Sequence, residues 1–254
     1  KFRIKIKNFK TRYDYWKSVE FSKQEWFKIK KYCQRKKVIF LSSVFSLKGF
    51  NVLNDLGVLA WKVASGEYNS NYILREMYKT KKPILVSTGL MNNREIYKMH
   101  RILNKNKIHH AFLHCVSNYP VKLTKVGLNN IENLKKKLNC IVGYSDHSEG
   151  IAIPTAATAL GATLIEKHFT LDSSLPGPDH IASLEPDELK SMVDAIRAIE
   201  VALGNGTKKP TTSELKNQYV VRKSLVAAQE IKKGETFTEE NLVIKRPGNG
   251  DNPM

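Results

Sequence analysis

The sequence predicts an α/β fold of the TIM type, a (β/α)8 barrel, followed by a small and mostly β domain. Three observations support this prediction. Six short apolar segments alternate with amphipathic segments, each apolar segment ends in a polar cluster, and the C-terminal part alternates short β-type segments with turns. Together they predict a barrel domain over residues 1–204, a linker over 205–218 and a small domain over 219–254.

Buried parallel strands have continuous apolar sequences, and six such runs are expected to be the strands of the barrel. They occupy residues 38–41, 60–64, 83–86, 111–115, 140–144 and 162–166. Helical patterns cover residues 22–35, 47–56, 70–81, 92–105, 128–138 and 151–160, and a longer one covers 185–203. The first begins with a capping box of Ser22 and Glu25. This repeated alternation predicts a parallel α/β sheet.

Polar clusters follow the apolar runs, for example Ser87-Thr88-Gly89 and Ser145-Asp146-His147. In a barrel the carboxyl ends of all strands form one active-site face, whereas a doubly wound sheet gathers its site at one switch point. The distribution over all strand ends therefore favours the barrel. Because six strands are too few to close it, we expect one or two N-terminal strands to be missing from this stretch.

The composition excludes several classes of protein. A hydrophobic content of 41% is enough for a sizeable core, and no apolar run is long enough for a membrane span or a secretory signal. The net charge of +18 comes from lysines scattered over helix faces, so nucleic-acid binding is not expected. Cys33, Cys115 and Cys140 show no CxxC spacing and indicate reduced thiols in a cytoplasmic protein.

His147 and His168 each follow an apolar run, so in a barrel they would come from neighbouring strands. Two imidazoles placed in this way can hold a divalent metal ion, although they could equally be hydrogen-bonded residues of a polar rim. Asp179 lies in a proline-rich loop beside His168, where it could contact a substrate, cap a helix or pair with a surface lysine.

Lys62 lies within an apolar strand, and a buried cation requires an anionic partner. Phosphate or carboxylate would be a natural partner. Four serines near strand ends could supply neutral hydrogen-bond donors around it, although each alone is an ordinary loop residue: Ser43, Ser65, Ser87 and Ser145.

These motifs resemble the bacterial N-acetylneuraminate (sialic acid) synthases. The resemblance is carried by residues 62–67, 87–89, 114–120, 143–147, 166–172 and 175–180. The tail from Arg222 to Gly248 resembles the antifreeze-like (SAF) domain of this family, and the resemblance implies that this domain is incomplete at its C-terminus. The resemblance implies that His147 and His168 bind a divalent metal ion, manganese or magnesium. It also implies a domain-swapped homodimer, in which Arg246 of one chain closes the site of the other.

The resemblance further implies roles around two substrates, phosphoenolpyruvate and an N-acetylated hexosamine. Phosphoenolpyruvate would contact Lys62, Ser65, Ser87 and Ser145, with Ser117 nearby and Ser43 at a position where the family often has threonine. Tyr119, Asp179 and Arg246 would contact the sugar, and Glu67 would be a further acidic group; the catalytic set would be Lys62, Glu67, Asp179 and Arg246.

The implied reaction is the metal-assisted condensation of phosphoenolpyruvate with N-acetylmannosamine and water to give N-acetylneuraminate and phosphate. Two alternatives remain open. The protein could make legionaminic or pseudaminic acid from a related sugar, or it could be a degenerate, non-catalytic fragment of the family. The Leu175–His180 sequence favours sialic or legionaminic acid over pseudaminic acid.

Overall fold

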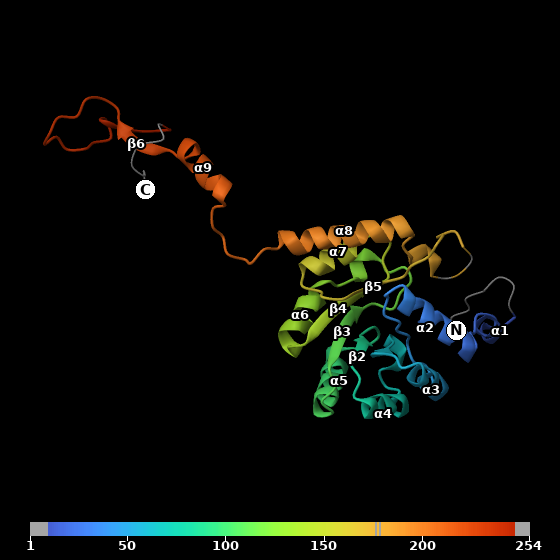
Figure 1. Ribbon diagram of the computed structural model, residues 1–254. Coiled ribbons are helices and arrows are strands. Elements are labelled where there is room, and N and C mark those ends of the chain that lie inside the picture. Colours follow the sequence, from blue (N-terminus) through green and yellow to red (C-terminus); the bar gives the residue numbers. More distant parts are fainter. Residues whose placement is uncertain (1–9, 176, 178, 247–254) are drawn as a thin grey trace. The chain divides into compact units, whose positions relative to one another are not determined.

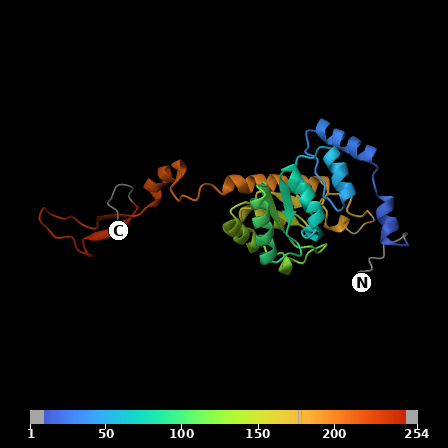
Figure 2. The same cartoon turned by 90° about the horizontal axis from the view of Figure 1, so that it is seen from below.

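The structure is a computed structural model that describes residues 10–175, 177 and 179–246. The chain divides into two compact units, Lys1–Leu203 and Gly204–Met254. The first unit contains a parallel sheet with helices outside it, and the second contains one helix and a pair of strands (Figures 1 and 2).

Five parallel strands form the sheet of the first unit, and their order in space is their order in the chain. They are β1 (Trp61–Val63), β2 (Ile84–Ser87), β3 (His110–Cys115), β4 (Ile141–Asp146) and β5 (Ile165–Lys167). A doubly wound sheet would reverse its strand order at a switch point, whereas consecutive βα units of a barrel do not. The unreversed order therefore confirms the predicted barrel-type α/β class.

Helices flank the strands in sequence and cover the outer side of the sheet (Figure 1). They are α3 (Leu47–Asp55), α4 (Asn71–Thr80), α5 (Asn93–Lys105), α6 (Asn129–Leu138), α7 (Ala152–Ala159) and α8 (Pro186–Ala202), while α2 (Lys23–Arg35) precedes them. All seven were predicted to within a few residues. The capping box of Ser22 and Glu25 is present at the start of α2, as expected.

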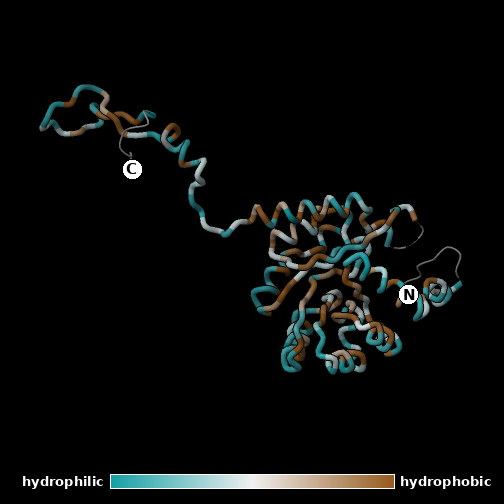
Figure 3. The backbone as a smooth tube through the Cα atoms, viewed as in Figure 1, coloured by the Kyte–Doolittle hydropathy of each residue, from teal (hydrophilic) through white to brown (hydrophobic). Residues whose placement is uncertain are grey.

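The core lies between the sheet and these helices. Trp61, Ile84 and Phe112 are completely buried on successive strands, and Trp61 stacks on Phe50 of α3 with ring centroids 4.7 Å apart. Figure 3 shows hydrophobic residues along the strands and alternating hydropathy on the helices. This pattern is expected when strands are buried on both faces and helices on one.

The predicted strand over residues 38–41 is not formed. Val38 and Ile39 are 59% and 67% exposed, and the parallel pairing on that side of β1 is limited to a single bridge between Ser43 and Lys62. An apolar run stays in a strand when a partner strand and a covering layer bury it. Phe40 packs against Trp26 of α2, but Val38 and Ile39 have no such cover in the described part of the chain. The sixth predicted strand is formed, but it begins later, at Ile165.

The second unit contains α9 (Thr212–Val221) and an antiparallel pair, β6 (Ser224–Ala227) and β7 (Leu242–Lys245). The pair agrees with the predicted β character of this region. The helix was not expected, because most of its residues were assigned to a linker; a capping box of Thr211 and Glu214 starts it. A second unexpected helix, α1 (Arg12–Ser18), has a similar box. No helix in the described residues has the length and apolar character needed to cross a membrane.

Candidate functional site

Lys62 of β1 is the centre of a polar network at the carboxyl ends of the strands. Its Nζ donates to Ser87 Oγ on β2 at 2.6 Å and lies 3.3 Å from Glu166 Oε2 on β5. Ser145 of β4 donates to the other oxygen of Glu166 at 2.7 Å. The structure thus brings together three of the predicted site residues, Lys62, Ser87 and Ser145.

Glu166 was not among the predicted site residues. A signal was present, because a carboxylate within an apolar strand requires a cationic or hydrogen-bonding partner just as Lys62 does. Its side chain remains 45% exposed, whereas that of Lys62 is 11% exposed. The ammonium group is therefore partly desolvated and retains an open side, an arrangement suited to attracting an anion.

His147 lies at the end of β4 and is oriented by the backbone. Its Nδ1 donates to the Val116 carbonyl at 2.8 Å, which leaves Nε2 free. A carbonyl that fixes one ring nitrogen in this way is typical of metal-binding histidines. Cys115 Sγ lies 4.0 Å from His147 Nδ1, and Ser65 Oγ donates to the same sulfur at 3.7 Å. Ser65 is thereby connected to the histidine.

His168 follows β5, and its ring centroid lies 5.4 Å from that of His147. Two imidazoles bound to one ion at about 2.1 Å have centroids about 4.5 to 5.5 Å apart, so this spacing fits a shared ion. No third His, Cys, Asp or Glu of the described residues completes a cluster with them. The pair would therefore leave several coordination positions for water or substrate.

The environment moves the pKa values of these groups in opposite directions. Burial lowers the pKa of His168, and the nearby His147 adds to this effect against the opposing charge of Asp179. Burial also acts to lower the pKa of His147, but its hydrogen bonds to Cys115 and the Val116 carbonyl outweigh it and raise that pKa. Burial would raise the pKa of Cys115, yet the hydrogen bonds from His147 and Ser65 lower it.

Tyr119 covers the two histidines. Its ring centroid lies 4.0 Å from that of His147 and 5.6 Å from that of His168. Burial, and then the charges of Cys115, Asp179 and Glu166, raise the pKa of Tyr119 to about 12, so its hydroxyl is a hydrogen-bond donor at neutral pH. Tyr119 therefore lies against both histidines, and Asp179 is close enough for its charge to act on His168 and Tyr119. Of the loop before Asp179, Pro176 and Pro178 lie outside the described residues.

Ser117 completes a small cradle of hydroxyl groups. Its Oγ is the one buried side-chain polar atom in the described residues that has no hydrogen-bond partner. A Cβ added to Gly89 would lie 2.2 Å from Ser117 Oγ and 2.5 Å from Ser65 Oγ, so both hydroxyls lie close to the backbone of Gly89, where no side chain is present. A buried hydroxyl without a hydrogen bond costs free energy, so its presence here is consistent with a group that binds a polar ligand.

Behind the two histidines lies a buried ion pair that the sequence analysis did not single out. Lys167 Nζ lies 2.6 Å from Asp146 Oδ2, and the two side chains are 2% and 0% exposed. Asp146 also accepts hydrogen bonds from Tyr144 Oη at 2.9 Å and from both the backbone and hydroxyl of Ser148. Each member precedes one histidine in sequence, so the pair links the ends of β4 and β5 directly at the predicted metal ligands.

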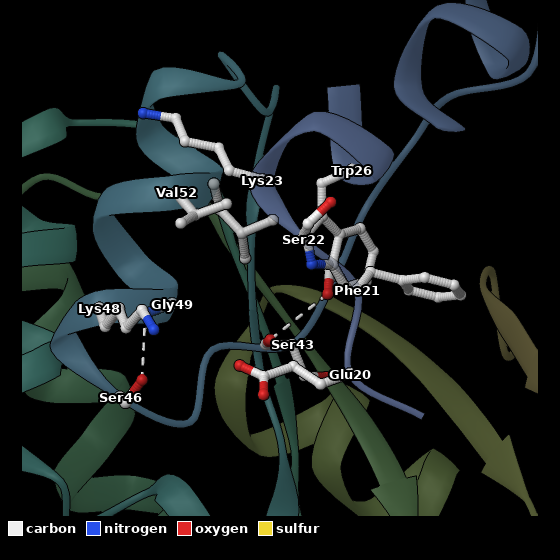
Figure 4. Close-up of a pocket in the computed structure, with 12 residues that line it drawn as sticks. Glu20, Phe21, Ser22, Lys23, Trp26, Ser43, Ser46, Lys48, Gly49 and Val52 are labelled. Carbon is white, nitrogen blue, oxygen red and sulfur yellow. Dashed lines mark hydrogen bonds between the residues drawn. The ribbon is translucent and has the colours of Figure 1, made fainter. Parts of the chain in front are cut away.

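Ser43 pairs with Lys62 in an isolated parallel bridge beside β1, and it also lines a pocket between α2 and α3 together with Trp26 and Val52 (Figure 4). Two other predicted site residues have different surroundings. Glu67 Oε2 accepts from Ser70 Oγ at 2.5 Å, which ties it to the start of α4. Arg246 follows β7 in the second unit and is exposed.

Residues 1–208 match the model of the NeuB family. The chain belongs to the NeuB family. Residues 222–254 match the SAF domain, so the predicted resemblance is confirmed in both parts of the chain.

Relatives of this NeuB chain include two proteins named N,N'-diacetyllegionaminic acid synthase. The one from Campylobacter jejuni is 47% identical over 85% of this chain and 66% of its own length. The one from Legionella pneumophila is 36% identical over 96% of this chain and 70% of its own length. The chain thus spans about two thirds of each.

A solved structure of N-acetylneuraminic acid (sialic acid) synthetase from Leptospira borgpetersenii, in complex with citrate, is similar to this chain with a TM-score of 0.75 and 36% identity. The match covers 79% of this chain and 70% of that one.

Proposed function

We propose that this NeuB-family protein condenses phosphoenolpyruvate with an N-acetylated hexosamine to form a sialic-type nine-carbon acid and phosphate. The observation that carries the proposal is the Lys62 network beside the paired imidazoles of His147 and His168, all at the carboxyl ends of parallel strands. In barrel enzymes this face is where catalytic groups gather.

Lys62 and the surrounding hydroxyls would bind phosphoenolpyruvate. The ammonium group of Lys62 offers a partly desolvated positive charge, and Ser87 and Ser145 are already hydrogen-bonded to its network. The unpaired hydroxyl of Ser117, with Ser65 beside it at Gly89, would provide further donors for phosphate or carboxylate oxygens. Holding phosphoenolpyruvate in the orientation for attack lowers the activation barrier, because the bound reactants have already lost the translational and rotational entropy that two free reactants would lose on reacting.

His147 and His168 would hold a divalent ion, manganese or magnesium, because the free Nε2 of His147 and the ring spacing both fit one. Such an ion would supply Lewis-acid polarisation of the sugar aldehyde. Burial lowers the pKa of His168, which favours the neutral ring that a metal ligand must have. Asp146 and Lys167 would hold the two histidines at this spacing.

The reaction balances without a redox partner. C3 of phosphoenolpyruvate forms a bond to the aldehyde carbon, and the aldehyde oxygen takes up a proton. Water adds at C2, the C2–O bond to phosphate breaks, and the water oxygen becomes the ketone oxygen at C2. Of the two protons of this water, one balances the proton taken up by the aldehyde oxygen and the other leaves with the phosphate. Tyr119, which donates from a hydroxyl with a pKa of about 12, and Asp179 would orient the sugar.

The second substrate is a six-carbon N-acetylated sugar, because three of the nine product carbons come from phosphoenolpyruvate. The sequence resemblance favours N-acetylmannosamine, whereas the names of two relatives favour a sugar with two acetamido groups. The proposal includes roles for Glu67, Ser43 and Arg246 of a swapped partner chain, and a cytoplasmic location. All three cysteines are free, which supports a reducing compartment.

The decisive experiment incubates the protein with phosphoenolpyruvate, manganese and each candidate hexosamine, and measures phosphate release. Lys62→Met should lower the rate by about 100-fold or more, as expected when a preorganised charge is removed. Lys79→Met, on the exposed face of α4, is the matched control and should leave the rate unchanged. Absence of phosphate release with every sugar would favour a degenerate, non-catalytic member of the family, and full activity of Lys62→Met would contradict the assignment of Lys62.

A further inference from the structure

A second group of potential metal ligands lies at the amino ends of the strands. His110 is the first residue of β3, Cys140 directly precedes β4, and His100 lies on α5. Ligand atoms of these three side chains lie within 4.8 Å of one another. Within the described part of the chain this is the one cluster of three or more His, Cys, Asp or Glu with such a geometry.

This cluster is separate from the proposed active site. β3 and β4 run parallel, with Ala111 opposite Ile141 at one end and Cys115 opposite Ser145 at the other. The six residues from His110 to Cys115 are separated by five steps that span roughly 16 Å of extended strand. The cluster is therefore at the opposite end of the sheet from His147 and shares no residue with that site.

Hydrogen bonds fix the two imidazole rings in a defined arrangement. His110 Nδ1 lies 2.8 Å from the Ile108 carbonyl and must carry a proton to bond with it, so Nε2 has the free lone pair. That lone pair faces His100 Nδ1 at 2.8 Å. His100 Nε2 lies 2.9 Å from the Asn104 amide. A carbonyl behind one ring and an amide behind the other are the outer partners that metal-binding histidines have.

We propose that His100 Nδ1, His110 Nε2 and Cys140 Sγ form a zinc site, with water as the fourth ligand. Two imidazoles and one thiolate are a ligand set that suits zinc rather than magnesium or manganese. Tetrahedral zinc requires its nitrogens to be about 3.3 Å apart, so the two rings would separate by about 0.5 Å. The Asn104 amide would turn to accept the proton on His100 Nε2.

Cys140 is free to complete this site. Among the described residues, its one hydrogen-bond partner is the Ile141 carbonyl at 3.6 Å, a weak contact, and the residue is half-buried. It also lines a surface pocket with Asn139 and Thr163, which provides a path for an ion. Burial raises the pKa of this thiol, so zinc would displace its proton on binding. The bound ion would connect α5 to β3 and β4 and stabilise this end of the barrel unit.

Cobalt(II) tests the site, because a thiolate bound to cobalt gives a charge-transfer absorption band in the near ultraviolet. We expect one equivalent of cobalt per chain to produce this band and zinc to abolish it. Cys140→Ser should lose the band, whereas Cys33→Ser on α2 and Cys115→Ser beside His147 should retain it. A band that survives in Cys140→Ser, or that is lost in Cys115→Ser, would overturn the proposal, as would no band in the unmodified protein.

Two further measurements separate a metal site from a plain hydrogen-bonded pair of histidines. Competition with a chromogenic chelator should show zinc affinity at least about tenfold weaker in Cys140→Ser and in His100→Gln. Glutamine is chosen for His100 because its side chain can still form hydrogen bonds from α5. Zinc should raise the Tm of the unmodified protein but not of these variants. An equal Tm shift in all three proteins would refute the assignment. Manganese-dependent phosphate release should be unchanged in Cys140→Ser.

Discussion

Replacing Asp146 by Asn should be among the most destabilising single changes in the barrel unit. The carboxylate and the Lys167 ammonium are 0% and 2% exposed and 2.6 Å apart, so the substitution leaves a buried cation without its counter-charge. Breaking a buried pair from one side costs about 3 to 5 kcal/mol. The weaker hydrogen bonds from Tyr144 and Ser148 to the remaining amide add to this cost.

Urea unfolding followed by tryptophan fluorescence measures this cost, because Trp16, Trp26 and Trp61 all lie in the first unit. The double variant Asp146→Asn/Lys167→Met should recover most of the loss, since replacing both members of a buried pair is often nearly neutral. Asp194→Asn removes the exposed partner of Lys190 on α8 and should give no measurable change. A loss below about 1 kcal/mol in Asp146→Asn, or no recovery in the double variant, would refute the argument.

Three other outcomes are expected. Ser117→Ala should leave the free energy of unfolding unchanged or slightly higher, because the Ser117 hydroxyl has no hydrogen-bond partner in the described residues. The same substitution should raise the KM for phosphoenolpyruvate, and a clear loss of stability in urea unfolding would contradict the reasoning. Gly143→Ala should destabilise the protein by about 1 to 3 kcal/mol, since the added Cβ would lie 2.5 Å from the Leu164 carbonyl oxygen, and a thermal melt with unchanged Tm would exclude the clash. Burial lowers the pKa of His114 despite its hydrogen bond to the Val126 carbonyl, so the native state disfavours its protonation. Stability should therefore be full above the unfolded pKa of about 6.5 and fall at lower pH, by at most about 1.4 kcal/mol per pH unit, and His114→Asn should reduce this slope in a pH series of urea unfolding.

The buried Asp146–Lys167 pair also gives a structural reason for the spacing of His147 and His168, the proposed metal ligands. A covalent neighbour of each predicted ligand is anchored to the other strand, so β4 and β5 cannot shift against each other without breaking the pair. Loss of the pair should therefore weaken manganese binding at His147 and His168 even where the chain stays folded. Titration of manganese against the double variant would measure this contribution separately from stability.

Local sequence determined most of the secondary structure. The helices from α2 to α8 follow from capping residues and from apolar positions that recur every three or four residues, which are properties of adjacent residues alone. The strands from β1 to β5 follow from continuous apolar runs. The strand predicted at residues 38–41 is not formed, because burial rather than composition decides whether an apolar run pairs with another strand. α9 was missed because its capping box stands in a polar segment.

The sequence by itself determined the class of fold, that Lys62 lies within a strand, and that His147, His168 and Ser145 stand at strand ends, because parallel strands align their carboxyl ends. Only the tertiary structure decided which side chains meet across those strands. Glu166 reaches Lys62 from the far side of the sheet, and His100, His110 and Cys140 converge from a helix and two strand starts. Such contacts depend on strand register and helix packing, which sum many weak interactions over distant residues and leave no local pattern in the chain.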